Sequence, residues 1–296
     1  MLAPVGMVGD VARNVGGECV EVSVMMAPGT DPHLYQPTAS DVGRLQSAEL
    51  ILYVGYGLEG QLGEVLGSLA GRVPTLAVAE AAAAPDALIA EEEAAAGVDP
   101  HLWMDASLWA QIVPAIGDAI IALRPDCAEA GEENAAAYAE SLAALHDWVV
   151  ETIATIPQDV RTLVTAHDAF EYYGAAYGLE VEAIQGISTE TEASIGDIRE
   201  AADVVVERGV PAVFIETTLN PRTIQAMVEA AEARGHEVEI GGELYSDAMG
   251  EEGTADGTYI GMIRANTLTI AEALGGTAPP LPSALAGWAD EWDVAD

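Results

Sequence analysis

Lysine is absent from this sequence. All ten basic residues are arginine, and they stand against 49 aspartates and glutamates, which gives a formal net charge of −39. Such an excess of negative charge argues against nucleic-acid phosphate or an anionic membrane as a partner. It also causes self-repulsion unless salt screens it, and the Debye length is only about 3 Å at 1 M. We interpret the acidity as a solvated surface adapted to high salt.

Cysteine and long apolar runs are also scarce. Cys19 and Cys127 lie far apart and match no metal-ligand or redox spacing, so we predict two inert or buried thiols. No apolar run reaches the length of about 18 residues that a membrane helix needs, so we predict no transmembrane helix. The opening residues MLAPVGMVGD lack the charged start and apolar core of a signal peptide.

Short apolar runs alternate with helical patterns along the chain, which is typical of buried parallel strands and covering helices. We expect strands over residues 19–26, 49–55, 73–79, 161–166, 179–186, 211–217 and 236–246. We expect helices over residues 7–15, 58–70, 108–122, 169–178, 194–208, 221–235 and 257–276, and a further helix start at the capping box of Thr38 and Asp41. The chain therefore opens on a helix with no strand before it.

The longest helical pattern lies in the middle of the sequence, over residues 127–156. At 1.5 Å per residue this helix would be about 45 Å long, which favours a rigid connector between two halves. The sequence predicts an N-terminal α/β lobe over 1–126, a connecting helix over 127–157 and a C-terminal α/β lobe over 158–296. Both lobes would have mainly parallel sheets. The Ala- and Glu-rich residues 80–98 are expected to form an acidic surface loop.

One short phrase occurs twice. Asp-Pro-His-Leu followed by an aromatic residue places His33 and His101 in two loops, each just before a helix start. Because proline restricts the backbone next to each histidine, the two imidazoles are presented in matched ways. The repeated phrase predicts half of a metal site.

His167 and Asp247 would supply the other half, because both follow expected strands at their carboxyl ends. Ligands of open α/β sheets bind at that edge. Three imidazoles and a carboxylate suit Zn²⁺, and Mn²⁺ also fits if Asp247 binds with both oxygens. Each loop histidine alone would favour a capping or core role. We expect His146 to be a satisfied or exposed residue of the central helix and His236 to be a surface turn residue. The prediction depends on all four residues together.

These residues carry a resemblance to the TroA-like substrate-binding proteins of zinc and manganese ABC importers. The matching stretches extend over about residues 7–276 and include PGTDPHLYQPTASD, DPHLW, LVTAHDAFEYYGAAYGLEV, IQGISTETEAS and GGELYSDAMG. The resemblance implies a metal cleft between two lobes, with His33, His101, His167 and Asp247 as ligands. It implies a protein that is not an enzyme, that captures Zn²⁺ or Mn²⁺ and that delivers the ion to a membrane permease as a monomer at the cell surface.

The sequence departs from that family in three places. It lacks the histidine-rich loop of many zinc-specific relatives, so the preference between Zn²⁺ and Mn²⁺ stays open. It also lacks the expected first strand and an export signal. We therefore expect that Met1 lies downstream of the true start and that an N-terminal segment anchors the protein to the membrane.

Carboxylates are expected to orient the imidazoles, and the candidates are Asp31, Asp99, Glu190 and Glu216. Because a metal ion displaces imidazole protons, affinity should fall below about pH 6.5. A single connecting helix bends little, so we expect a small lobe movement when the ion leaves.

Three other functions stay open at this point. A metallohydrolase needs an open coordination position and a general base, and no His-Glu-x-x-His helix occurs here. A protein that binds a metal chelate needs a wide aromatic site with arginines near the four ligands. A structural or adhesive surface protein would hold a metal that cannot be removed without unfolding.

Overall fold

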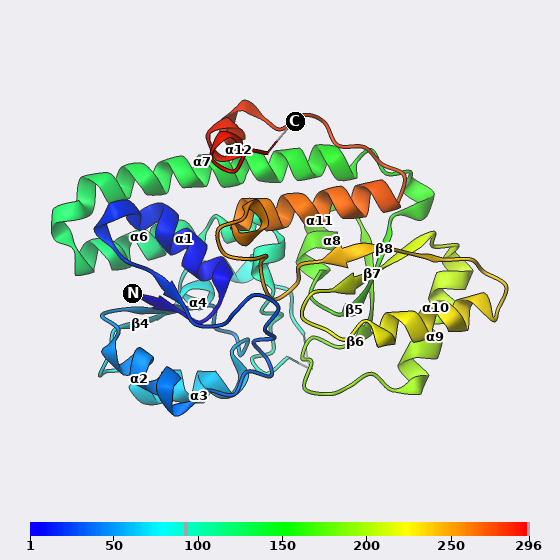
Figure 1. Cartoon of the computed structure of the whole chain (residues 1–296), viewed down its shortest axis with the longest axis horizontal. Coiled ribbons are helices and arrows are strands. Elements are labelled where there is room, and N and C mark those ends of the chain that lie inside the picture. The colour runs from blue at the N-terminus through cyan, green and yellow to red at the C-terminus, as the bar shows by residue number, and fades with distance from the viewer. Residues whose placement is uncertain (92–93, 295–296) are drawn as a thin grey trace.

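The computed structural model describes residues 1–91 and 94–294. Two α/β lobes lie side by side, and helix α7 (Ala128–Ile153) extends across both of them, as Figure 1 shows. Its 26 residues correspond to about 39 Å at 1.5 Å per residue. The predicted fold class, two α/β lobes with parallel sheets and one long central helix, is confirmed.

The N-terminal lobe is built on a parallel sheet with the strand order β2-β1-β3-β4. Its strands are β1 (Leu2–Ala3), β2 (Ser23–Val24), β3 (Ile51–Tyr53) and β4 (Thr75–Ala77). The prediction of a missing first strand is wrong, because β1 lies inside the sheet and Leu2 pairs with both Ser23 and Ile51. Two residues are too few to produce an alternation in the sequence, so the pattern gave no signal for this strand.

Short helices surround this sheet. They are α1 (Gly6–Gly16), α2 (Ala39–Ser47), α3 (Gly60–Leu69), α4 (Val78–Ala82), α5 (Ala106–Trp109) and α6 (Ile112–Leu123). The expected acidic loop over 80–98 is only partly right, since α4 and a one-turn helix at Pro85–Ala87 occupy its first part. Residues 92–93 of that loop lie outside the described residues.

The helix expected over 108–122 is divided in two. Helix α5 ends at Trp109, and α6 begins at Ile112, so Pro114 falls in the first turn of α6. A proline is tolerated there because first-turn N–H groups have no partner within the helix. By length and composition alone, Ala106–Leu123 is apolar enough to cross a membrane, and 44% of this stretch is buried in the structure.

The C-terminal lobe contains two parallel strand pairs. Strand β5 (Thr162–His167) pairs with β6 (Glu180–Gln185), and β7 (Ala212–Glu216) pairs with β8 (Glu239–Leu244). Its helices are α8 (Glu171–Tyr177), α9 (Ile195–Arg208), α10 (Arg222–Glu232), α11 (Tyr259–Ala273) and α12 (Ala286–Glu291). Helix α12 was not expected from the Pro- and Ala-rich tail. Helices α11 and α12 lie along α7 at the top of the molecule (Figure 1).

One apolar core is shared by the two lobes. The same cluster of buried side chains includes Met7 of α1, Leu145 of α7 and Tyr259 of α11. A second, smaller cluster lies within the C-terminal lobe and includes Val213 and Met227. Because burial of apolar surface stabilises a contact roughly in proportion to its area, separating the lobes along α7 would be costly.

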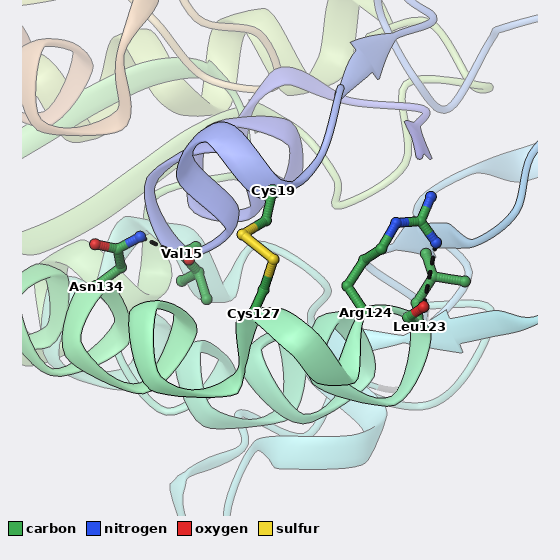
Figure 2. The surroundings of a disulfide bond; sticks show 6 residues. All are labelled: Val15, Cys19, Leu123, Arg124, Cys127 and Asn134. Carbon is green, nitrogen blue, oxygen red and sulfur yellow. Dashed lines mark hydrogen bonds between the residues drawn. A yellow bond between two sulfur atoms is a disulfide. The ribbon is translucent and has the colours of Figure 1, made fainter.

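A disulfide bond joins Cys19 to Cys127, so the prediction of two inert thiols is wrong. Figure 2 shows the bond between the turn that follows α1 and the start of α7, next to a hydrogen bond from the Asn134 amide to the Val15 carbonyl oxygen. The Cα atoms lie 6.3 Å apart, although 108 positions separate the residues in sequence. The packing of α1 against α7 brings the cysteines together, and the spacing of the cysteines in the sequence does not predict that packing. Disulfides of this kind form in oxidising compartments outside the cytoplasm.

Removal of the bond should lower stability. We expect Cys127→Ser to reduce the free energy of unfolding by about 2–5 kcal/mol, because the oxidised unfolded chain is constrained by a long loop. Denaturant titration of the oxidised protein, the variant and the variant Cys19→Ser/Cys127→Ser measures this difference. The double variant serves as the control and should match the single one. Two reactive thiols in the native, unreduced protein would contradict the bond itself.

Candidate metal site

His33 lies in the loop between β2 and α2. The Asp31 carboxylate accepts a hydrogen bond from the backbone N–H of His33 at 2.8 Å, so the aspartate of the repeated phrase closes its own turn. This interaction fixes the histidine through its backbone. The His33 side chain is 5% exposed.

His101 uses the second copy of the phrase differently. One oxygen of Asp99 accepts the backbone N–H of His101 at 2.9 Å and also lies 2.7 Å from its ring Nδ1. The carboxylate therefore orients the imidazole as well as the backbone. With Nδ1 occupied, Nε2 points to the interior and is free to bind a ligand.

His167 is the last residue of β5, whereas the sequence placed it just beyond the strand. Glu216 is the last residue of β7, and its Oε1 accepts the backbone N–H of Ala166 at 2.8 Å and that of His167 at 2.9 Å. Its Oε2 lies 2.5 Å from His167 Nδ1. The ends of two strands in one lobe thus fix the third imidazole.

Asp247 follows β8 and completes the group from the C-terminal lobe. The residue is 1% exposed, and neither carboxylate oxygen accepts a hydrogen bond from the described residues, although ring nitrogens of His101 and His167 lie 3.3 and 3.2 Å away. A buried carboxylate is costly unless its charge is balanced, so this arrangement calls for a positive charge among the rings, either imidazole protons or a bound cation.

The four side chains converge on one point. His33 Nε2 lies 3.3 Å from His101 Nε2, and the Asp247 oxygens lie 3.3 Å from His101 Nε2 and 3.2 Å from His167 Nε2. The distance from His33 Nε2 to Asp247 is 3.7 Å. A tetrahedral ion with ligands near 2.1 Å requires ligand atoms about 3.4 Å apart. The donor set and its spacing therefore fit a single small metal ion.

The pKa values of the four side chains depend strongly on burial and on the neighbouring charges. Burial alone lowers the pKa of His101, but Asp99 and Asp247 outweigh it and raise that pKa to about 9. Burial likewise opposes the charged form of His167, yet Glu216 and Asp247 raise its pKa well above the usual value. Burial dominates at His33 and lowers its pKa to about 4. Burial would raise the pKa of Asp247, but the neighbouring imidazoles hold it well below its usual range.

The four expected orienting carboxylates have different outcomes. Asp99 and Glu216 contact the rings as expected, whereas Asp31 holds only the backbone of its histidine. The expectation for Glu190 is wrong: it is exposed, and its backbone N–H donates to Ser188.

Sequence reasoning missed the residues that brace the loop of His101 against the other lobe. The Tyr172 hydroxyl donates to the Asp99 carbonyl oxygen at 3.0 Å, and the Trp103 indole N–H donates to the Ser246 carbonyl oxygen at 2.9 Å. Tyr259 donates in turn to the Trp103 carbonyl oxygen at 2.6 Å. The acceptors are backbone carbonyl oxygens, which every residue has, so no sequence pattern predicts these hydrogen bonds.

A buried cage of three imidazoles and one carboxylate, contributed by both lobes, defines a two-lobed binding protein with a site for one small cation. The model of the family described as the periplasmic component A of the zinc-uptake complex matches residues 2–273. The chain belongs to this family, which confirms the resemblance drawn from the sequence.

Individual relatives are similar over nearly the whole chain. The manganese-binding lipoprotein MntA of Bacillus subtilis is 42% identical over 272 residues, which cover 92% of this chain and 88% of that protein. The zinc-binding protein TroA of Treponema pallidum is 42% identical over 274 residues, which cover 93% of this chain and 88% of that protein. The solved structure of the Treponema pallidum periplasmic zinc-binding protein TroA superposes with a TM-score of 0.89 and covers 92% of this chain and 98% of that one.

Replacing the carboxylate behind His167 should weaken metal binding. We expect Glu216→Gln to reduce affinity by about 10–100-fold, because a neutral amide no longer raises the basicity of the ring. Equilibrium titration with Zn²⁺ measures the change. Glu243→Gln is the matched control, since Glu243 lies on the neighbouring strand but is exposed. Equal affinity of the two variants would show that Glu216 only supports the fold.

Metal binding should release protons even above neutral pH. The pKa of His101 is about 9 in the metal-free cage, and a metal ion binds only the neutral imidazole. Affinity should therefore fall steadily as pH decreases below about 9, by about tenfold per unit for each displaced proton, rather than only below 6.5. Calorimetry at pH 8 in buffers of different ionisation enthalpy counts the released protons. A count of zero would contradict this charge distribution.

Proposed function

We propose that this protein captures one Zn²⁺ or Mn²⁺ ion between its lobes and delivers it to the membrane permease of an ABC importer. One observation carries the proposal: four buried ligand atoms from both lobes lie within 4.8 Å of one another. The names of the relatives, a manganese-binding lipoprotein and a zinc-binding protein, support the same function.

The proposed ligands are His33, His101 and His167 through Nε2, together with Asp247. One oxygen from Asp247 would complete the four-coordinate shell that Zn²⁺ prefers. Both oxygens are without donors, so Asp247 is also able to bind with two and to satisfy Mn²⁺, which favours oxygen ligands and a larger shell. Relatives of equal similarity carry the name of either metal, so this choice depends on how Asp247 binds.

The geometry favours transport of an ion over the other functions. A hydrolase needs an open coordination position, but the four ligand atoms already suffice for a tetrahedral shell, and Asp99 and Glu216 are engaged with Nδ1 of His101 and His167. The spacing of the four ligand atoms suits a bare ion and leaves no room for a metal chelate. Nothing in the comparisons supports hydrolysis.

We place the protein outside the cytoplasm, as a monomer attached to the membrane through a segment before the described fold. The disulfide between Cys19 and Cys127 supports an oxidising location. The apolar core shared by both lobes supports a small movement when the ion leaves, because a wide opening would expose that core.

Metal titration tests this function. We expect the stripped protein to bind one ion per chain in high salt, and we expect His167→Ala to lose that binding. Competition between Zn²⁺ and Mn²⁺ then identifies the preferred ion. His236→Ala is the control, because the His236 Nε2–H donates to the Val210 carbonyl oxygen beside a surface turn, so this substitution should not affect binding. Tight binding that survives His167→Ala would overturn the proposed ligand set.

A further inference from the structure

The four ligands are not held equally firmly. His101, His167 and Asp247 belong to a frame that is braced across the lobes by Tyr172, Trp103 and Tyr259 through the hydrogen bonds described above. The rings of His101 and His167 each have a carboxylate on Nδ1. His33 is instead held through its backbone N–H by Asp31. This asymmetry makes His33 the ligand that moves most easily.

Two of the four ligands border a cavity: Asp247 lines one with Val5 and Met25, and His33 lines another. This second cavity, of about 310 Å³, lies between the lobes, and its lining includes His33 but not the other three ligands. The N-terminal lobe contributes Tyr56 and Gln61 to its wall, and the C-terminal lobe contributes Ile187, Ser188 and Glu190. An ion on its way to the cage through this cavity would meet His33 first.

One hydrogen bond joins the two walls at this position. The Thr189 hydroxyl donates to the second oxygen of Asp31 at 2.6 Å, while the first oxygen of the same carboxylate accepts the His33 N–H. Thr189 is 4% exposed, so water is largely kept away from this bond. A hydrogen bond to an ionised carboxylate is stronger than one between neutral groups.

The loop that carries Thr189, residues 186–193, is itself anchored at its base. The Gln185 amide donates to the Thr191 carbonyl oxygen at 2.7 Å, and Ser194 starts α9 with a capping box. These two contacts hold the loop against the C-terminal lobe, so a movement of that lobe carries Thr189 with it. The hydroxyl couples the position of that lobe to the turn that presents His33.

We propose that the Thr189–Asp31 hydrogen bond is a latch that holds His33 in the cage and closes the passage through which the ion enters and leaves. This inference rests on the proposed function and adds the residue that controls the rate of exchange. Thr189 is a positioning residue, since it touches Asp31 and not the ion. When the bond breaks, the Asp31 turn is free to shift and His33 leaves the ion, while the other three ligands keep their places.

The test compares zinc exchange rates of the full chain and three variants. Thr189→Val removes the hydroxyl and keeps the shape, Thr189→Ser retains the hydroxyl, and Thr191→Val alters an exposed threonine of the same loop. Dissociation is followed with excess chelator. Association is followed by the intrinsic tryptophan fluorescence of the chain, because the ring of Trp103, one of its five tryptophans, lies 5.2 Å from that of His101. Thermal unfolding of the metal-free proteins checks that each variant is folded.

We expect Thr189→Val to raise both the association and the dissociation rate by about tenfold, the effect of one lost hydrogen bond to a charged group. Thr189→Ser and Thr191→Val should exchange zinc at the rate of the unaltered protein.

Three results would overturn the latch alone: unchanged rates in Thr189→Val, faster dissociation without faster association, or an equal effect of Thr191→Val. Failure of the unaltered protein to bind zinc would instead overturn the proposed function and the latch together.

Discussion

The structure depends on a buried carboxylate that lies among three imidazoles. Asp247 is almost completely buried, and the polar groups that face its carboxylate oxygens are the ring nitrogens of the three histidines. Its charge must be balanced there, by imidazole protons or by a metal ion, because burying an isolated charge is too costly. Two further carboxylates, Asp99 and Glu216, stand behind the rings and keep them basic. The two lobes, the strand ends and the repeated loop phrase together hold the carboxylates and the imidazoles next to one another.

Much of this arrangement was predictable because it follows from patterns with a local cause. His167 ends β5 and Asp247 follows β8, so both lie at the carboxyl ends of strands, and a repeated Asp-Pro-His phrase marks His33 and His101. The long central helix was visible from its periodicity, with bounds that differ from α7 by at most three residues at either end. Short elements were not visible: β1 has two residues, and α5 has four.

The features that the sequence could not reveal are those that arise from tertiary packing. The pairing of Cys19 with Cys127 depends on where α1 meets α7. Glu216 was one of four carboxylates expected to orient an imidazole. It does so, and Glu190 does not, because the ends of β5 and β7 are neighbours and bring Glu216 to the ring of His167. The two copies of the histidine phrase look equivalent in sequence. They differ in the fold because Asp99 reaches its ring and Asp31 reaches the opposite lobe instead.

The disulfide also has a topological effect on the site. The covalent ring that it closes runs from Cys19 to Cys127 and contains both His33 and His101, whereas His167 and Asp247 lie outside it. Peptide bonds within the ring, including those of the exposed residues around 95–97, are open to proteases in an extracellular setting. A single cut there leaves the chain covalently continuous through the sulfur bridge. Both histidines of the N-terminal lobe would then stay attached to the half that carries their partners.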